Sequence, residues 1–173
     1  MTAPVVRGVG AVAAEMVAQA AELVAVLARQ AGHSAIAADA QSISARASGL
    51  SVSNEIAFVR ASRELRAARG GHGDESDLAH AIANAADVPL RVCEIASDLV
   101  LLACGLATGP LSSCAADLAG VAQLADGACS AAALLVSANS TLAADDPRRA
   151  QARAASTAAT AASRRLIAQL TAA

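Results

Sequence analysis

The side chains best suited to acid–base chemistry are a few carboxylates in an almost uncharged stretch of the second half of the chain. No basic residue occurs between Val92 and Pro147, and the helices predicted there carry only Glu94, Asp98, Asp117 and Asp126. Helices so poor in charge are expected to be covered on most sides, and burial raises the pKa of a carboxyl group by desolvating its charged form. Asp117 and Glu94 are therefore candidate catalytic residues, with a helix-terminal acid and an interhelical hydrogen bond as the respective structural alternatives.

Four arginines that recur at every third position give the chain a candidate anion-binding surface. They are Arg60, Arg63, Arg66 and Arg69, all in the second predicted helix. A guanidinium group presents a planar fork of donors that matches a carboxylate or phosphate, so Arg60 and Arg63 are candidates to bind an anionic part of a ligand. The structural alternative is a solvated helix face.

The cysteines and histidines form no pattern typical of a metal site or a catalytic triad. No two cysteines make a C-x-x-C pair, and none has a histidine at ligand spacing. Their apolar surroundings are typical of reduced core thiols in a cytoplasmic protein. We therefore expect no metal site and no tightly bound cofactor. The four cysteines are Cys93, Cys104, Cys114 and Cys129.

The composition indicates a folded domain whose core consists of small aliphatic side chains. The 173 residues are enough for one domain spanning 1–173, and 55% hydrophobic with 16% charged residues argues against disorder. Phe58 is the only aromatic residue. Because each contact between alanines buries little area, stability must come from long helices or from a second chain, and we predict a homodimer. A net charge of −2 and the absence of stacking aromatics argue against nucleic acid as a partner.

No segment of the sequence is predicted to enter a membrane. The longest apolar run, 99–107, has nine residues, whereas a membrane-spanning helix needs about 20. The first ten residues show neither a continuous apolar stretch nor a cleavage pattern typical of a signal peptide. We therefore expect a cytoplasmic protein.

Hydrophobic periodicity predicts an all-α bundle of about five long helices and no strand. Apolar residues recur at spacings of three and four, which is the helical pattern. Gly49 and Ser51 could interrupt the second helix, and Pro89 is expected to break or kink the third because it lacks a backbone donor. The helices are expected over 9–30, 35–68, 74–107, 112–142 and 147–170.

Three runs of residues carried by these helices match a known pattern. They are Ala85-Ala86-Asp87-Val88-Pro89-Leu90-Arg91-Val92, Asp117-Leu118-Ala119-Gly120-Val121-Ala122 and the run that ends at Asn139. The first resembles the middle signature of the cyclodeaminase/cyclohydrolase family, which is related to the cyclodeaminase half of formiminotransferase-cyclodeaminase. The second resembles the family's S-D-x-x-V-A element, and the third resembles A-A-L-N-V-x-x-N. The match is continuous over about 76–139 and weaker over 8–58.

The resemblance implies an all-helical subunit that dimerises and takes a tetrahydrofolate derivative as its substrate. The implied reaction is closure of 5-formimino-tetrahydrofolate to 5,10-methenyl-tetrahydrofolate with loss of ammonia, or hydrolysis of the methenyl compound. Asp117 is the implied acid, and Arg60 and Arg63 would bind the glutamate tail. The implied substrate-binding positions also include Gly8, Gly10, Asn54 and Asn139.

The chain departs from the family pattern at several polar positions. Gly8-Val9-Gly10-Ala11 stands where the family has G-G-G-S, Asn54 where it often has aspartate, Ala83 where it often has lysine, and Leu135 where it has the first Asn. Three functions therefore stay open. They are a one-carbon folate enzyme, a repurposed relative acting on another cyclic iminium or amidine-like substrate, and a non-catalytic helical dimer.

Helix geometry separates two of the implied site residues. Asp117 and Asn139 are 22 positions apart, which is about 33 Å along an unbroken helix. They could serve one reaction only if the helix breaks between them, or if an antiparallel second copy brings its own Asp117 to Asn139.

Overall fold

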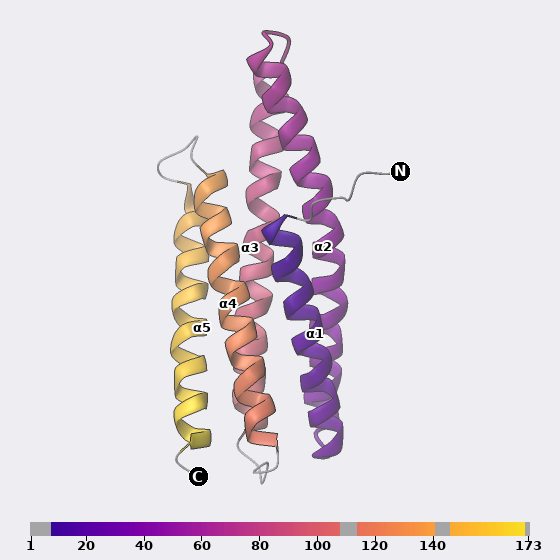
Figure 1. Ribbon diagram of the computed structural model, residues 1–173, viewed down its shortest axis with the longest axis vertical. Coiled ribbons are helices and arrows are strands. Elements are labelled where there is room, and N and C mark those ends of the chain that lie inside the picture. The colour runs from indigo at the N-terminus through magenta and orange to yellow at the C-terminus, as the bar shows by residue number, and fades with distance from the viewer. Residues whose placement is uncertain (1–7, 108–113, 141–145, 172–173) are drawn as a thin grey trace.

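The computed structural model describes residues 8–107, 114–140 and 146–171, and within these residues the chain is a bundle of five helices without strands (Figure 1). The all-α prediction is thereby confirmed. The helices are α1 (Val9–Gln30), α2 (Ser34–Arg69), α3 (Glu75–Leu106), α4 (Ala115–Asn139) and α5 (Pro147–Thr171).

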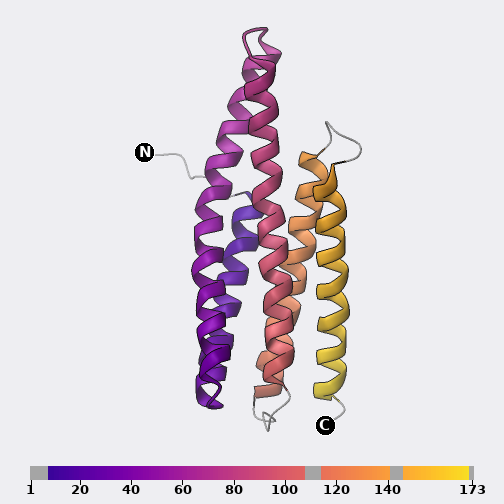
Figure 2. The same ribbon diagram turned by 180° about the vertical axis from the view of Figure 1, so that it is seen from behind.

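Successive helices run in opposite directions, and α3 packs against all four others. Seen from the front and from behind, the α2–α3 hairpin extends past the ends of α4 and α5, and α1 begins beside the middle of α2 (Figures 1 and 2). The start of α1 and the end of α4 therefore meet the α2–α3 hairpin at the same level of the bundle.

The core is built from alanine, valine, leucine and isoleucine, as the composition predicts. Ala14, Ala21 and Ala28 of α1 are fully buried, and they recur every seven residues along one face. Alanine at such positions lets neighbouring helices approach closely, so that larger side chains fill the remaining space. The largest fully buried side chains include Ile95, Leu99, Leu106, Leu118 and Leu166.

The interruptions predicted within α2 and α3 are wrong. Helix α2 continues through Gly49, and α3 continues through Pro89 without a break. The proline sits deep inside the bundle, where neighbouring helices hold α3 in place, and the carbonyl group that it leaves without a helical donor receives one from another helix, as described below. Tertiary packing thus overrides the local preference.

The acids of the almost uncharged stretch are not buried by the helices of a single chain. Glu94, Asp98 and Asp117 are exposed, and Asp126 is half-buried and accepts a hydrogen bond from the Thr160 hydroxyl at 2.7 Å. The helices themselves do carry the core, but the acids project from the sides that the bundle leaves uncovered.

Helices α1 and α4 are apolar on their uncovered sides as well. Each is long and apolar enough, by length and composition alone, to cross a membrane, a property shared by core helices of soluble proteins. In the most apolar 18-residue stretch of each helix, the bundle buries 61% of the stretch in α1 but only 39% of the stretch in α4. The exposed apolar positions follow the spacing of three and four: Val9, Val12, Leu23 and Val26 on α1, and Gly120, Leu124, Gly127, Leu134 and Ala138 on α4. Met16 and Ala131 between them are half-buried, and the polar residues Gln19, Glu22 and Gln123 are exposed beside them.

Candidate ligand-binding site

A cavity of about 340 Å³ lies where the start of α1 and the end of α4 meet the α2–α3 hairpin. Its volume is at the lower end of the range for small-molecule sites, which suits a ring system of two fused rings better than a long ligand. Its walls come from four helices and the residue before α1: Gly8, Val9, Gly10, Asn54, Ala57, Phe58, Ala61, Ser62, Leu65, Ala85, Pro89, Leu135 and Asn139.

The first turn of α1 lies directly against Asn54, and this contact requires glycine at position 10. A Cβ atom on Gly10 would lie 2.3 Å from the Asn54 Oδ1 atom, whereas one on Gly8 would lie 3.8 Å from Asn54 Nδ2. Real Cβ atoms do not approach oxygen so closely, so Gly10 is fixed by the position of the amide. Asn54 itself is only 9% exposed, and its carboxamide is held between α1 and the cavity.

Asn139 is tied to the proline of α3. Pro89 has no backbone N–H, so the carbonyl oxygen of Ala85, four residues earlier, lacks its helical donor. The Asn139 Nδ2 atom donates a hydrogen bond of 2.6 Å to that oxygen. A carbonyl group inside the bundle that lacks a hydrogen bond lowers the free energy of unfolding. The Asn139 amide prevents this loss by donating to the Ala85 carbonyl oxygen. Asn139 therefore holds the end of α4 against α3 at the cavity wall.

An ion pair fixes α5 to the same region of α3. The Arg148 Nε atom lies 2.9 Å from Asp87 Oδ1, and the Nη1 atom lies 3.2 Å from Asp146 Oδ2. Asp146 also caps α5, since its Oδ1 accepts from the Arg148 backbone N–H at 2.9 Å. The start of α5 is thus anchored two residues from Ala85, beside the wall that Asn139 closes.

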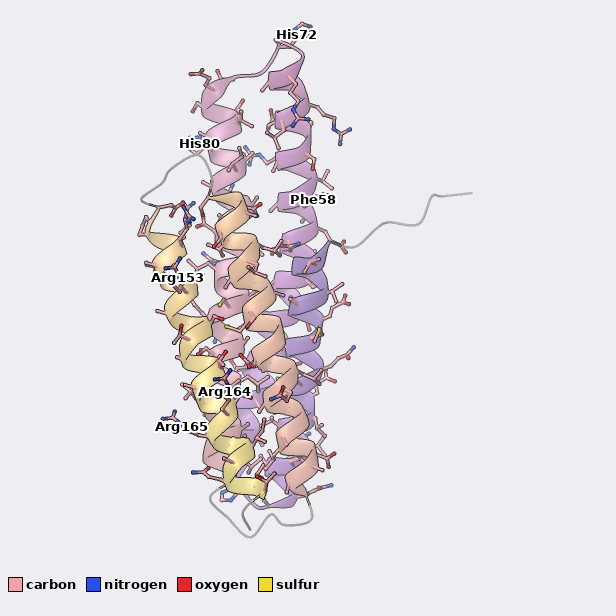
Figure 3. All side chains as sticks on the ribbon, turned by 60° about the vertical axis from the view of Figure 1, so that its left-hand side comes forward. Phe58, His72, His80, Arg153, Arg164 and Arg165 are labelled. Atoms are coloured by element: carbon pink, nitrogen blue, oxygen red, sulfur yellow. The ribbon has the colours of Figure 1, made fainter. Side chains whose placement is uncertain are left out.

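The rim of the cavity carries the single aromatic side chain. Phe58 is 59% exposed although it lines the cavity, and it projects from α2 in the part of the hairpin beyond the start of α1 (Figure 3). Leu65 and Leu135 add apolar surface. A half-exposed phenyl ring over an apolar cavity is suited to stacking on a flat ring system.

The cavity contains amides but no ionisable side chain among its lining residues that the structure describes. Asn54 and Asn139 each offer both a donor and an acceptor, and Ser62 adds a hydroxyl. With this lining the cavity can orient a polar flat ligand and a water molecule. It has no carboxylate, imidazole or thiol with which to transfer a proton.

The predicted site residues divide into a group that converges and a group that does not. Gly8, Gly10, Asn54 and Asn139 all line the cavity. The family signatures located them together with Ala85, Pro89 and Leu135. The sequence singled out Phe58 only as the one aromatic residue and gave no signal for the apolar remainder of the lining.

The remaining predicted site residues lie outside the cavity of this chain. Asp117 is exposed in the first turn of α4, at the opposite end of an unbroken helix from Asn139, and Glu94 is exposed on α3. Arg60 is exposed on α2. Arg63 is also exposed, and its guanidinium pairs with Glu64 at 2.6 Å. A solvated helix face thus describes the arginine row in the single chain.

Comparison with solved structures shows that the fold is similar to that of a known protein. The chain superposes on a formiminotetrahydrofolate cyclodeaminase from Thermotoga maritima with a TM-score of 0.79, over 95% of this chain and 85% of that one, at 19% sequence identity. No protein-family model and no curated protein sequence matches the chain. The likeness confirms the cyclodeaminase-like fold that the sequence motifs predict.

Proposed function

We propose that this protein binds a one-carbon derivative of tetrahydrofolate in the cavity between α1, α2, α3 and α4. One observation carries the proposal. Four of the six positions that the resemblance assigns to substrate binding, Gly8, Gly10, Asn54 and Asn139, come from distant parts of the chain and line a single cavity. A fold shared with a folate enzyme supports it.

The lining suits the pterin ring of such a ligand. A pterin is flat and bicyclic, and its edge carries amide-like donors and acceptors. Phe58 would stack on the ring face, and the carboxamides of Asn54 and Asn139 would pair with its edge. The cavity has room for the ring system but not for the glutamate tail. We place the tail along α2 toward Arg60, since the guanidinium of Arg63 is occupied by Glu64.

Of the two reactions that the resemblance implies, we assign hydrolysis of 5,10-methenyl-tetrahydrofolate. Water adds to the carbon between the two nitrogens, the bond from that carbon to N5 breaks, and 10-formyl-tetrahydrofolate and one proton are released. The substrate carbon is already part of a cation and is therefore electrophilic. Orienting a water molecule toward this carbon is most of what a catalyst of this reaction has to do. The Asn54 carboxamide oxygen would accept a hydrogen bond from that water.

Cyclodeamination needs a proton donor in the site in addition to an oriented ligand. The nitrogen that leaves as ammonia has to be protonated, and the described lining of one chain offers no group that could donate this proton, so the donor would have to be Asp117 of a second copy. Binding without turnover is the second candidate function, and the same lack of an ionisable group favours it. The two candidates differ in one readout, which is the conversion of bound ligand.

We also propose that two copies of the chain pack through the uncovered sides of α1 and α4. The spacing of three and four on both helices is that of helix pairs with interlocking side chains, and Gly120 and Gly127 have open space where a Cβ would be. Val9 and Leu134 belong to this surface and lie at or next to the cavity. A second copy would therefore reach the cavity mouth and could bring its own Asp117 there.

Turnover by point variants tests the proposed reaction. We expect slow hydrolysis of the methenyl compound by the natural chain, and a fall in kcat/KM of roughly tenfold for Asn54→Ala, the size of one lost hydrogen bond of about 1.4 kcal/mol. Asn84→Ala is the matched control, because Asn84 is exposed on α3 outside the cavity. Saturable binding without conversion above the uncatalysed rate would select the second candidate function, and absence of both would remove the proposal.

A further inference from the structure

Two cysteine side chains that take no part in the cavity face each other in the middle of the bundle. Cys93 of α3 and Cys129 of α4 are both fully buried, and their sulfur atoms lie 2.9 Å apart. Cys93 Sγ is also 3.4 Å from the carbonyl oxygen of Cys129, and Cys129 Sγ is 3.2 Å from that of Cys93. The contact is reciprocal, so both helices hold the two thiols together.

We propose that Cys93 and Cys129 are an oxidation site that hydrogen peroxide converts to a reversible disulfide bond between α3 and α4. In the first step the Cys93 sulfur takes one oxygen atom from peroxide to become a sulfenic acid, and one water molecule is released. In the second step the Cys129 sulfur displaces that oxygen as a second water. In total, two thiols and one peroxide give one disulfide and two waters.

The environment of the pair assigns the two roles. The hydrogen bond with Cys129 lowers the pKa of Cys93, in spite of the opposing effect of burial. The pKa of Cys129 is raised, first by the same hydrogen bond and then by burial. These opposite directions favour Cys93 as the thiol that reacts first with peroxide, while the geometry that brings the two sulfurs together is the same for both.

Little movement separates the thiol pair from the bonded state. Disulfide sulfurs are about 2.05 Å apart, so the two atoms need to approach by roughly 0.9 Å. The buried neighbours on both helices include Ala96, Ala128 and Ala132, and such small side chains leave the helices free to adjust. Because the sulfurs are fully buried, peroxide reaches them only when the bundle opens briefly, and the reaction is expected to be slow.

The other two cysteines serve as internal controls. Cys104 and Cys114 are half-buried, and burial raises the pKa of Cys104. The Cys104 Sγ atom donates a hydrogen bond of 3.7 Å to the Ala162 carbonyl oxygen, whereas Cys93 and Cys129 contact each other through their sulfur atoms. An unselective oxidation would modify these more accessible thiols, whereas the proposed site would leave them reduced.

Peptide mapping of the oxidised protein tests the proposal. Trypsin leaves all four cysteines on one peptide, because no lysine or arginine lies between Arg91 and Arg148. Cleavage before aspartate instead gives fragments 87–97 with Cys93, 98–116 with Cys104 and Cys114, and 126–144 with Cys129. After peroxide treatment and alkylation in denaturant, we expect a reducible link between fragments 87–97 and 126–144, with fragment 98–116 alkylated at both cysteines.

Variants and stability supply the second readout. Cys93→Ser should lose the link, and the double variant Cys104→Ser/Cys114→Ser should keep it. The oxidised natural chain should melt on the order of 5 to 10 °C higher than the reduced chain, and a reductant should reverse the shift, since the bond closes a loop of 36 residues. Four alkylated cysteines after prolonged oxidation, or a link that involves fragment 98–116, would overturn the proposal. None of these outcomes depends on what the cavity binds.

Discussion

Single residues of the cavity have roles that follow from their closest contacts. Asn139 illustrates this, because its amide donates a hydrogen bond to a backbone carbonyl oxygen within the same chain and is therefore not reserved for a ligand. The family signature predicts that Asn139 binds the ligand. The structure shows the cavity position needed for that role and, in addition, the hydrogen bond to the Ala85 carbonyl oxygen.

The link between Asn139 and Pro89 predicts a coupled effect on stability. Asn139→Ala should lower the free energy of unfolding by about 1–3 kcal/mol, since it leaves the Ala85 carbonyl without a donor. In a Pro89→Ala background the new backbone N–H can bond to that carbonyl, so the same substitution should cost clearly less. Urea denaturation of the four proteins of this double-mutant cycle measures the difference. Equal costs in both backgrounds would show that the hydrogen bond does not stabilise the fold.

Replacement of Asn54 by aspartate is expected to raise the activity. Asn54→Asp restores the carboxylate that the family often has there, in a place that is only 9% exposed. Burial should raise the pKa of the new carboxyl group, and the group accepts a proton only when it is ionised. Turnover should therefore exceed that of the natural chain and should increase with pH through the raised pKa. A flat pH profile with unchanged turnover would argue against position 54 as the place where a proton is exchanged.

The helices, taken as elements, were predictable from sequence to different degrees. The bounds of α1 match the prediction, because its apolar spacing is regular and Gly32 follows it in a left-handed conformation. Helix α3 was predicted to break or kink at Pro89 and does not break, because Asn139, 54 residues from Ala85, supplies the missing donor and a local rule cannot foresee this. The exposure of Asp117 and Glu94 was missed for a similar reason, because low charge density does not tell which side of a helix is covered.

We expect opposite effects when Gly10 at the start of α1 and Gly49 within α2 are each replaced by alanine. Gly10→Ala should destabilise the protein by about 1–3 kcal/mol and weaken ligand binding, because the new methyl group would collide with Asn54. Gly49→Ala, within α2 where nothing lies within 4 Å, should stabilise it by roughly 0.5–1 kcal/mol. Thermal unfolding of both variants checks the pair. A harmless Gly10→Ala would mean that α1 and Asn54 are not in contact.

The whole molecule presents an apolar surface that a single chain leaves uncovered. Leu134 is 72% exposed, and it lies on the uncovered side of α4 among small residues. The outward side of α1 also carries the exposed polar residue Gln19, which suits a protein interface better than lipid. Packing of two copies through these sides would bury the surface and bring a second chain to the cavity mouth.

Sedimentation velocity tests this assembly. The natural chain should sediment as a dimer, and Leu134→Arg should shift it toward the monomer, because an arginine at the centre of an apolar contact remains unpaired. Ala158→Arg, at an exposed position of α5, should leave the dimer intact. A natural chain that is monomeric throughout the micromolar range would contradict the proposed dimer, and partition into vesicles instead would indicate a lipid partner.

Calorimetric titration with 5-formyl-tetrahydrofolate, a stable one-carbon derivative, tests most directly whether the cavity is a folate site. We expect saturable binding with one ligand per chain, and an affinity roughly tenfold lower for Phe58→Ala, which removes a stacking contribution of about 1.4 kcal/mol. Absence of saturable binding by the natural chain, or equal affinity in the Phe58→Ala variant, would contradict it.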